Sequence, residues 1–386
     1  MTRQAVVVSA CALALACGCG SRSGVSAAKK GMEAFKEGRY EKAIAQFTAA
    51  TERITHSPEL YYHLGLAHVE QGNMNLAQDA FQAALELKPE KDEANILGGL
   101  GLAAYHKGDY TNALVTLTRA LAAAPDNNTR ARVLTMMGMV EASRQNYSLA
   151  RLNYLRARKA DRSYAPAYYN VAVLYQEQFS LLEEALDEFK LFLGVTDKKN
   201  KNREKAENHI KRLNIILERR KAERESIRRR PAQAAGFLQE GVNAAAAKQY
   251  PKAVKAYKDA LTADPFTFNA ALGLGTVYRQ QGLRAEALDA FKKASDIKPE
   301  HQDSYHQAAD LALQLRQPAE AVKLLNRAIA RSPFNPESAR LMAQAAYAEV
   351  RISEARAYGE FYLSLVAADD PNRAAFERWV MSLPKN

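Results

Sequence analysis

The repeating unit of the chain is clearest from Phe268 to Pro299, in the segment FNAALGLGTVYRQQGLRAEALDAFKKASDIKP. Its apolar residues recur every three or four positions on both sides of Gly282, which predicts two amphipathic helices joined by a turn. Small residues stand where the two helices would touch, Gly275 in the first helix and Ala287 in the second. Neither helix could bury its apolar face alone, so the unit needs copies of itself on both sides.

The copies are present at a fixed period. Two series of residues, one of alanines and one of prolines, recur every 34 positions. They are Ala253, Ala287, Ala321 and Ala355, and Pro265, Pro299 and Pro333. A sustained period of this length predicts a stacked array of helical hairpins, in which each repeat packs against its neighbours.

The same small-residue pairing occurs nine times along the chain. The pairs are Gly31 and Ala43, Gly65 and Ala77, Gly101 and Ala113, Gly138 and Ala150, Ala172 and Ala185, Gly241 and Ala253, Gly275 and Ala287, Ala309 and Ala321, and Ala343 and Ala355. In most copies an aromatic residue or Leu follows the second-helix Ala by four positions. This pattern resembles the tetratricopeptide repeat. The resemblance implies an all-α fold, a right-handed α-solenoid of helical hairpins.

We expect two arrays separated by a long basic helix. The expected parts are a signal peptide with lipobox and short tether at 1–25, an array of about five repeats at 26–196, a basic helical connector at 197–231, an array of about four repeats at 232–369 and a C-terminal capping helix at 370–386.

The end of the second array departs from the pattern. Gly359 stands where a bulky residue belongs, which predicts a degenerate end repeat. The amphipathic segment from Arg373 to Leu383 is expected to be a lid helix that covers the last apolar face, with Trp379 packed there.

The N-terminus has the features of an export signal. Arg3 is followed by an uncharged apolar run from Ala5 to Ala16, and small residues follow the run. The end of the run, LALAC, resembles a bacterial lipobox, in which a Cys becomes lipid-modified. Cys17 fits this role best, and Cys19 is the alternative.

Lipidation at either Cys would give a membrane-anchored lipoprotein that faces the periplasm. The residue after the modified Cys would then be Gly18 or Gly20, and not the Asp that acts as a retention signal in such lipoproteins. The resemblance to the lipobox therefore implies the outer membrane. Acyl chains would hold the protein at the bilayer more firmly than a surface patch could. The alternative is an ordinary cleaved signal that releases a soluble periplasmic protein.

The positive charge is concentrated in one segment. The chain carries a formal charge of +11, and residues 197–230 contain 14 Lys and Arg against 6 Asp and Glu. The segment is rich in helix formers and has no Gly or Pro before Pro231, which predicts one long helix. Ala206, Ile210, Leu213 and Leu217 mark an apolar face in its first half, so we expect this half to be docked and the rest solvated.

The basic segment could bind acidic headgroups or an acidic partner. The candidate cations are Lys211, Arg212, Arg219, Arg220, Arg228, Arg229 and Arg230. A solvated connector with no binding role is the alternative. Nucleic acid is not an expected partner, because the segment has no aromatic residue on which bases could stack.

The sequence gives no sign of catalytic chemistry. All three cysteines lie in the first twenty residues, and the seven histidines show no HExxH or other compact ligand spacing. We therefore expect no metal, no cofactor and no enzymatic activity.

The repeats instead predict a binding groove. In arrays of the family that this chain resembles, the first helices line the concave face. Carried onto this chain, the first array offers Met32, Phe35, Tyr62, Leu66, Val69, Leu102, Tyr105, Met139, Tyr169 and Val173. Such a mainly apolar and aromatic groove suits an amphipathic helix or an extended apolar peptide. The alternative is that neighbouring repeats partly bury some of these residues.

The expected function is that of a non-catalytic scaffold of the bacterial cell envelope, anchored by lipid, that binds segments of other envelope proteins. The chain looks like lipoproteins that assist pilus or secretion assembly or gather cell-wall enzymes. The alternatives are a soluble periplasmic adaptor and a membrane-surface binding protein that acts through the basic helix. The sequence leaves the oligomeric state open.

Overall fold

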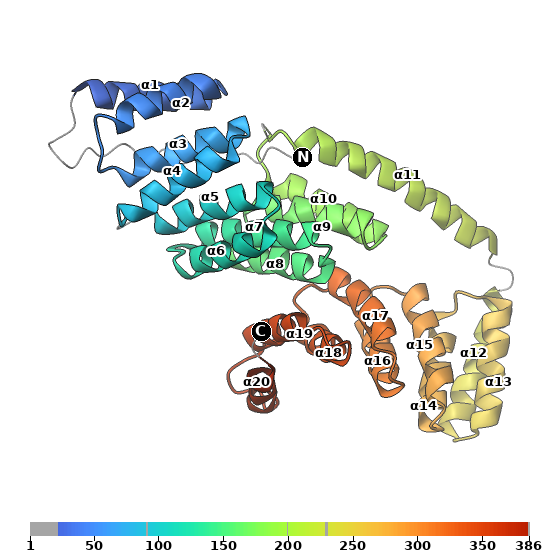
Figure 1. The fold of residues 1–386 in the computed structure, drawn as a ribbon. Helices are drawn as coiled ribbons and strands as arrows, with labels where there is room; N and C mark the ends of the chain where they lie inside the picture. The colour runs from blue at the N-terminus through green and yellow to red at the C-terminus, as the bar shows by residue number, and fades with distance from the viewer. Residues whose placement is uncertain (1–21, 90–91, 199, 228–230, 385–386) are drawn as a thin grey trace. The chain divides into compact units, whose positions relative to one another are not determined.

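The computed structural model describes residues 22–384 except 90–91, 199 and 228–230, and every regular element among them is a helix (Figure 1). The chain divides into two compact units, one up to Asn170 and one from Val171. The expected division lay at 197–231, whereas the units divide earlier, inside helix α9 (Ala165–Glu177).

The first unit is a stack of four helical hairpins, in which each helix packs on the next (Figure 1). Its helices are α1 (Arg22–Lys36), α2 (Tyr40–Thr51), α3 (Pro58–Gln71), α4 (Met74–Glu86), α5 (Glu93–His106), α6 (Tyr110–Ala122), α7 (Asn127–Ser143) and α8 (Tyr147–Ala160). Helix α1 begins at Arg22, so residues 22–25 of the expected tether already belong to it.

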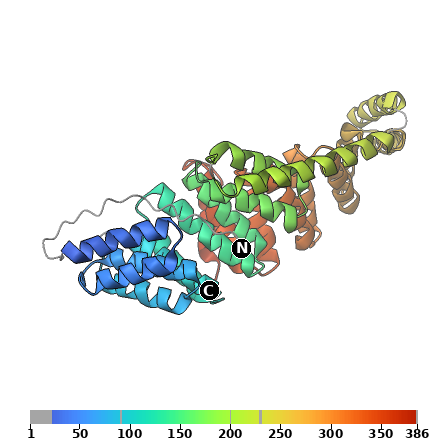
Figure 2. The same ribbon diagram turned by 90° about the horizontal axis from the view of Figure 1, so that it is seen from above.

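The second unit holds the long helix and the second stack of hairpins. Its helices are α10 (Leu182–Val195), α11 (Arg203–Ile227), α12 (Pro231–Ala246), α13 (Tyr250–Ala263), α14 (Phe268–Gln280), α15 (Arg284–Ile297), α16 (Gln302–Gln314), α17 (Pro318–Arg331), α18 (Pro336–Ala348), α19 (Ile352–Leu365) and α20 (Arg373–Ser382). Helix α11 packs on α10 (Figures 1 and 2). The predicted all-α array of hairpins is confirmed.

The two helices of a hairpin approach closely because the first-helix glycine has no side chain. A Cβ added to Gly65 would lie 2.6 Å from the Phe81 ring, and one added to Gly241 would lie 2.6 Å from the Tyr257 ring. In all nine pairs the second-helix Ala is fully buried, at 0% exposure. The small residues and the rings four positions beyond the Ala are therefore core, as interior packing density requires.

The same rings also set the distance to the following repeat. Phe81 lies against Gly99 of α5, where an added Cβ would stand 2.5 Å from the ring. Tyr257 lies in the same way against Gly273 of α14, at 2.6 Å. Each of these rings thus fills the space between two successive first helices, which the sequence pattern alone did not indicate.

The turn inside each hairpin needs one residue in the left-handed region of backbone space. Gly38, Gly72, Gly108 and Gly282 supply it with φ of 76° to 87°, which a glycine adopts without steric cost. In the other hairpins a residue with a side chain does so. These residues are Gln145, Ser180, Lys248, Arg316 and Val350. Val350, at φ 60°, is β-branched and therefore the most strained of them.

Gly359 has a packing role beyond the predicted degenerate end repeat. It lies on α19 directly beneath Val380 of α20, and a Cβ at Gly359 would stand 2.5 Å from the Val380 side chain. Arg356 also donates hydrogen bonds to the carbonyls of Leu383 and Pro384, which hold the end of α20 in place. The lack of a side chain at Gly359 thus leaves room for the last helix, α20.

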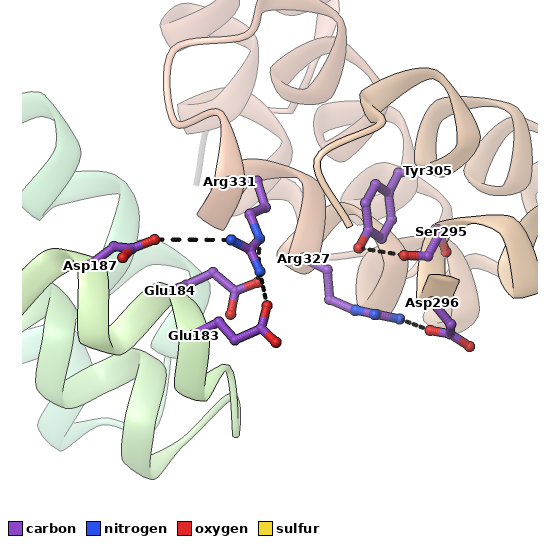
Figure 3. A network of polar contacts seen from close by, with 8 residues as sticks. All are labelled: Glu183, Glu184, Asp187, Ser295, Asp296, Tyr305, Arg327 and Arg331. Atoms are coloured by element: carbon purple, nitrogen blue, oxygen red, sulfur yellow. Dashed lines mark hydrogen bonds and ion pairs between the residues drawn. The ribbon is translucent and has the colours of Figure 1, made fainter. Parts of the chain in front are cut away.

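A polar network joins two helices of the second unit that are far apart in the sequence (Figure 3). Arg331 of α17 pairs with Glu183 of α10, 148 positions away, and its Nε lies 3.0 Å from Glu184 Oε1. Burial raises the pKa of Glu184, and the Arg331 guanidinium opposes that shift. Beside it, Arg327 binds Asp296 and so joins α17 to α15. Helix α17 therefore contacts α10, the helix that precedes α11 in the sequence.

Adjacent glycines of α5 allow a matched test of the packing. We expect Gly98→Ala to raise the free energy of unfolding by about 0.5–1 kcal/mol, because a Cβ there meets only Met136 Sδ at 3.9 Å and Ala favours a helix over Gly. Gly99→Ala should lower it by about 1–3 kcal/mol, since the Phe81 ring leaves no room. Urea unfolding of both variants measures the difference, and equal effects would contradict the packing role of Gly99.

Val350 gives a test of the turn. It is 79% exposed, so its side chain adds little packing, and relief of the left-handed strain should dominate. We expect Val350→Gly to stabilise the second unit by about 0.5–1 kcal/mol, the strain relieved less the extra freedom of Gly in the unfolded chain. The reverse change at the matching position, Gly282→Val, should destabilise it. Thermal unfolding compares the two variants, and a loss of stability in Val350→Gly would show that the turn is not strained.

Candidate partner-binding surfaces

The ten predicted groove residues come from consecutive first helices, α1, α3, α5, α7 and α9. Two of them belong to the core: Leu66 is 4% exposed and packs against Phe81 and Ile96, and Tyr169 is 7% exposed. Val173 lies in the second unit. The remaining residues are half-buried in the first unit. They are Met32, Phe35, Tyr62, Val69, Leu102, Tyr105 and Met139, and we call this set the apolar row.

Neighbouring side chains hold the rings of the apolar row in place. Phe35 makes an edge contact with Tyr40 at 5.6 Å between ring centroids, and Tyr62 lies 6.0 Å from Phe81. The Tyr105 hydroxyl forms a 3.2 Å hydrogen bond with Ser143 Oγ of α7. These residues contribute to the fold with part of their surface and present the rest to the outside.

The same helices also carry polar residues that were not predicted from the sequence. Arg132 of α7 donates to Asn95 of α5, and Asn95 Nδ2 donates to Asp92 Oδ1 at 2.7 Å. Burial raises the pKa of Tyr164 to about 12, and Arg132 opposes the shift. Burial also raises the pKa of Tyr62, which Arg132 opposes in the same way.

A positional signal could have found this pair. Asn95 and Arg132 each stand six residues before the first-helix glycine of their repeat, Gly101 and Gly138. That position was not among those carried over from the family resemblance, so the polar part of this surface went unnoticed.

A second hollow lies at the end of the second unit, between α18, α19 and α20. This cavity of about 820 Å³ is lined by four rings, those of Tyr347, Tyr362, Phe376 and Trp379, together with polar side chains that include Arg340. The rings contact one another in sequence, with centroids 4.6 to 5.8 Å apart.

The Arg340 guanidinium in this hollow is occupied within the protein. It donates to Glu337 through Nε at 2.8 Å and through Nη2 at 2.5 Å, and Nη1 donates to Gln344 at 3.3 Å. The hydrogen bonds from Arg340 hold the pKa of Glu337 below its usual value. The hollow thus combines aromatic walls with an internally paired charge, and nothing in it selects one class of ligand.

The basic helix α11 is docked through its first half only. Ala206 and Leu213 are buried, and the His209 ring stacks on Phe189 of α10 at 4.7 Å and 13°. His209 Nδ1 also forms a 2.9 Å hydrogen bond with Gln176 Oε1. Burial, and next the charge of Arg212, lower the pKa of His209, which favours the neutral ring at neutral pH.

The outer side of α11 is open. Lys211, Arg212, Arg219 and Arg220 are all exposed, as is every residue from Glu218 to Ile227. The remaining candidate cations, Arg228, Arg229 and Arg230, and the candidate lipidation residues, Cys17 and Cys19, lie outside the described residues.

Residues 22–384, within the limits given above, contain no group of three or more His, Cys, Asp and Glu side chains placed to hold a metal ion. In the same part of the chain, none of the helices combines the length and the apolar character that crossing a bilayer requires.

Parts of the chain resemble individual known proteins. A segment of 69 residues is 39% identical to protein bimA of Emericella nidulans, a match that covers 18% of this chain and 9% of that protein. Among solved structures, PilF of Pseudomonas aeruginosa is 15% identical with a TM-score of 0.39, over 64% of this chain and 95% of that one. MamA from Desulfovibrio magneticus RS-1 is 18% identical with a TM-score of 0.37, over 45% and 96%.

A tetratricopeptide repeat protein from Parabacteroides merdae is similar over 84% of this chain and 99% of its own, with 15% identity and a TM-score of 0.31. At TM-scores below 0.5, these likenesses carry no argument about function.

The family models give the more direct result. One model described as tetratricopeptide repeat matches residues 29–92, 62–128 and 238–301, and a second with the same description matches residues 278–345. Together the matched segments cover more than half of the chain, in both predicted arrays. The chain belongs to the tetratricopeptide repeat family.

Proposed function

We propose that this protein is a non-catalytic scaffold of the cell envelope, which holds segments of other envelope proteins on the first helices of its first unit. The observation that carries the proposal is the apolar row. Seven apolar or aromatic side chains on four consecutive first helices are half-buried, so each keeps surface that the fold does not use.

The chemistry of the row favours a peptide or helix over a small polar ligand. Phe35, Tyr62 and Tyr105 are rigid rings, and Met32 and Met139 are adaptable thioethers. Rings of this kind dominate binding energy in protein interfaces, because they bury much area at a low cost in conformational entropy. Methionine fits partners of varied shape. An amphipathic helix with apolar residues on one face would match this surface.

The polar pair beside the row supports the same occupant. Arg132 donates to Asn95 and lies close enough to Tyr62 to act on its pKa. The pair thus places hydrogen-bonding groups near one ring of the row, which a peptide backbone or a polar residue flanking its apolar face could use. A mainly apolar surface with a few placed polar groups is the usual composition of a specific binding site.

We further propose that lipid on Cys17 anchors the protein to the membrane, with the body of the chain in the periplasm and the outer membrane as the destination. The proposal rests on the apolar N-terminal run and on the lipobox-like LALAC. Modification at Cys19 instead, or cleavage without lipidation, would leave the binding surface unchanged and alter only how the protein is held.

The groove proposal is tested by Phe35→Ala combined with Tyr105→Ala. We expect the amount of partner protein recovered with this double variant to fall at least tenfold, since each ring removed from an interface costs about 1–2 kcal/mol. Affinity capture of the full chain from its own cells, followed by quantitative mass spectrometry, measures the loss.

Val115→Ala is the matched control, because Val115 is a 57% exposed apolar residue on the second helix α6. The control should keep its partners. Circular dichroism checks that both proteins remain folded, and a double variant that recovered the same partners at the same yield would refute the proposal.

Lipidation is tested on the mature N-terminus. We expect mass spectrometry to find a chain that begins at Cys17 and carries acyl groups, and Cys17→Ser to shift the protein from the membrane to the soluble fraction when cells are fractionated at high salt. An acylated chain that begins at Cys19 would move the site by two residues. An unmodified N-terminus would refute the anchor and favour the soluble adaptor.

A further inference from the structure

We propose that the outward face of α11 binds an anionic lipid bilayer surface, with Ile215 inserted among the headgroups and the cations around it on lipid phosphates. The first observation is the position of Ile215. It lies nine residues after Ala206, which is buried against the unit, and nine residues at 100° each place it on the opposite side of the helix. Ile215 is 68% exposed, so packing within the chain does not account for it.

The second observation is the charge around Ile215. Lys211, Arg212 and Arg219 lie four residues before, three before and four after it, so all three flank it on the outer side of the helix. Each is exposed, and none forms an ion pair or a hydrogen bond with another residue of the described chain. Glu218 is the only acidic residue within one turn of Ile215.

The third observation is how the helix is held. The stacking of His209 on Phe189 and the burial of Leu213 fix the first half of α11 against α10. One side of α11 is therefore occupied by its contact with α10. The opposite side, which carries Ile215, faces outward from a helix that is held in place. Beyond Leu217 the helix continues with Arg220, Lys221 and Arg224, all of them exposed.

An exposed isoleucine flanked by unpaired cations on one helix fits a bilayer better than a folded acidic protein. A stable protein interface buries about 800 Å² on each partner around an apolar centre. This face is instead a single convex helix whose apolar part is Ile215, with the less exposed Ile216 (42%) beside it. A lipid surface adapts to such a shape, and long Lys and Arg side chains reach phosphates while an apolar side chain enters the headgroup region. Because α11 has no Trp or Tyr to anchor it, binding should be mainly electrostatic and sensitive to salt.

The test uses the chain from Gly20 onward, which contains every described residue and none of the cysteines. Co-sedimentation is measured with vesicles of phosphatidylcholine alone and with 30% phosphatidylglycerol, at low and high salt. We expect binding only to the anionic vesicles, and its loss at high salt. No lipid anchor and no partner protein is present, so the result is independent of the proposed scaffold function.

The variants separate this face from general positive charge. We expect the triple change Lys211→Gln, Arg212→Gln and Arg219→Gln to weaken binding about a hundredfold, at about fivefold for each cation near an anionic surface. The control, Lys255→Gln, Arg284→Gln and Lys293→Gln, removes three exposed cations from other helices of the same unit and should change binding less than threefold. Ile215→Ser keeps the charge and should weaken binding several-fold.

Three results would overturn the proposal. They are equal binding by the two triple variants, equal binding to neutral and anionic vesicles, and failure to bind anionic vesicles at low salt. In that last case, binding to polyglutamate would assign the face to an acidic polypeptide instead. Circular dichroism verifies that each variant is folded, so a loss of binding reports on the surface.

Discussion

A ring held between two glycines sets the spacing of the repeats around Phe81 and Tyr257. Phe81 packs against Gly65 of its own repeat and Gly99 of the next, and Tyr257 packs against Gly241 and Gly273 in the same way. One side chain thereby fixes both the closure of a hairpin and the step to its neighbour. Because both contacts exclude even a methyl group, the interior of the array has little freedom to vary, and specificity has to lie on surfaces that the packing does not use.

Two surfaces of that kind follow from the way the helices are placed. The first helices leave half-buried rings and methionines in the first unit, while the docking of α11 through His209 turns the opposite face of that helix outward. In the second unit, the pairing of Arg331 with Glu183 and Glu184 joins α17 to α10, so this array is not held by neighbour contacts alone. Breaking such a half-buried pair would leave charge without compensation, which is costly in a partly desolvated site.

The features that depend on the local repeat period could be predicted from the sequence. The features that depend on contacts between distant helices could not. Helical hairpins, the core alanines and the rings over first-helix glycines all follow from a 34-residue repeat. The burial of Leu66 and Tyr169 agrees with the alternative that neighbouring repeats cover some groove positions. Which positions are covered did not follow from the sequence, because it depends on side chains of neighbouring elements that the family pattern does not fix. The fit of Val380 over Gly359 was missed for the same reason: it joins positions in different helices.

The central claim is that partners bind the first helices of the first unit. The most direct measurement is photo-crosslinking in living cells, with a photoreactive amino acid placed at Tyr105 of α5 or at Val115 of α6. Both positions reach the surface, but only Tyr105 belongs to the apolar row. Our expectation is discrete crosslinked adducts from position 105 and none from position 115. Adducts from position 115 alone would contradict it.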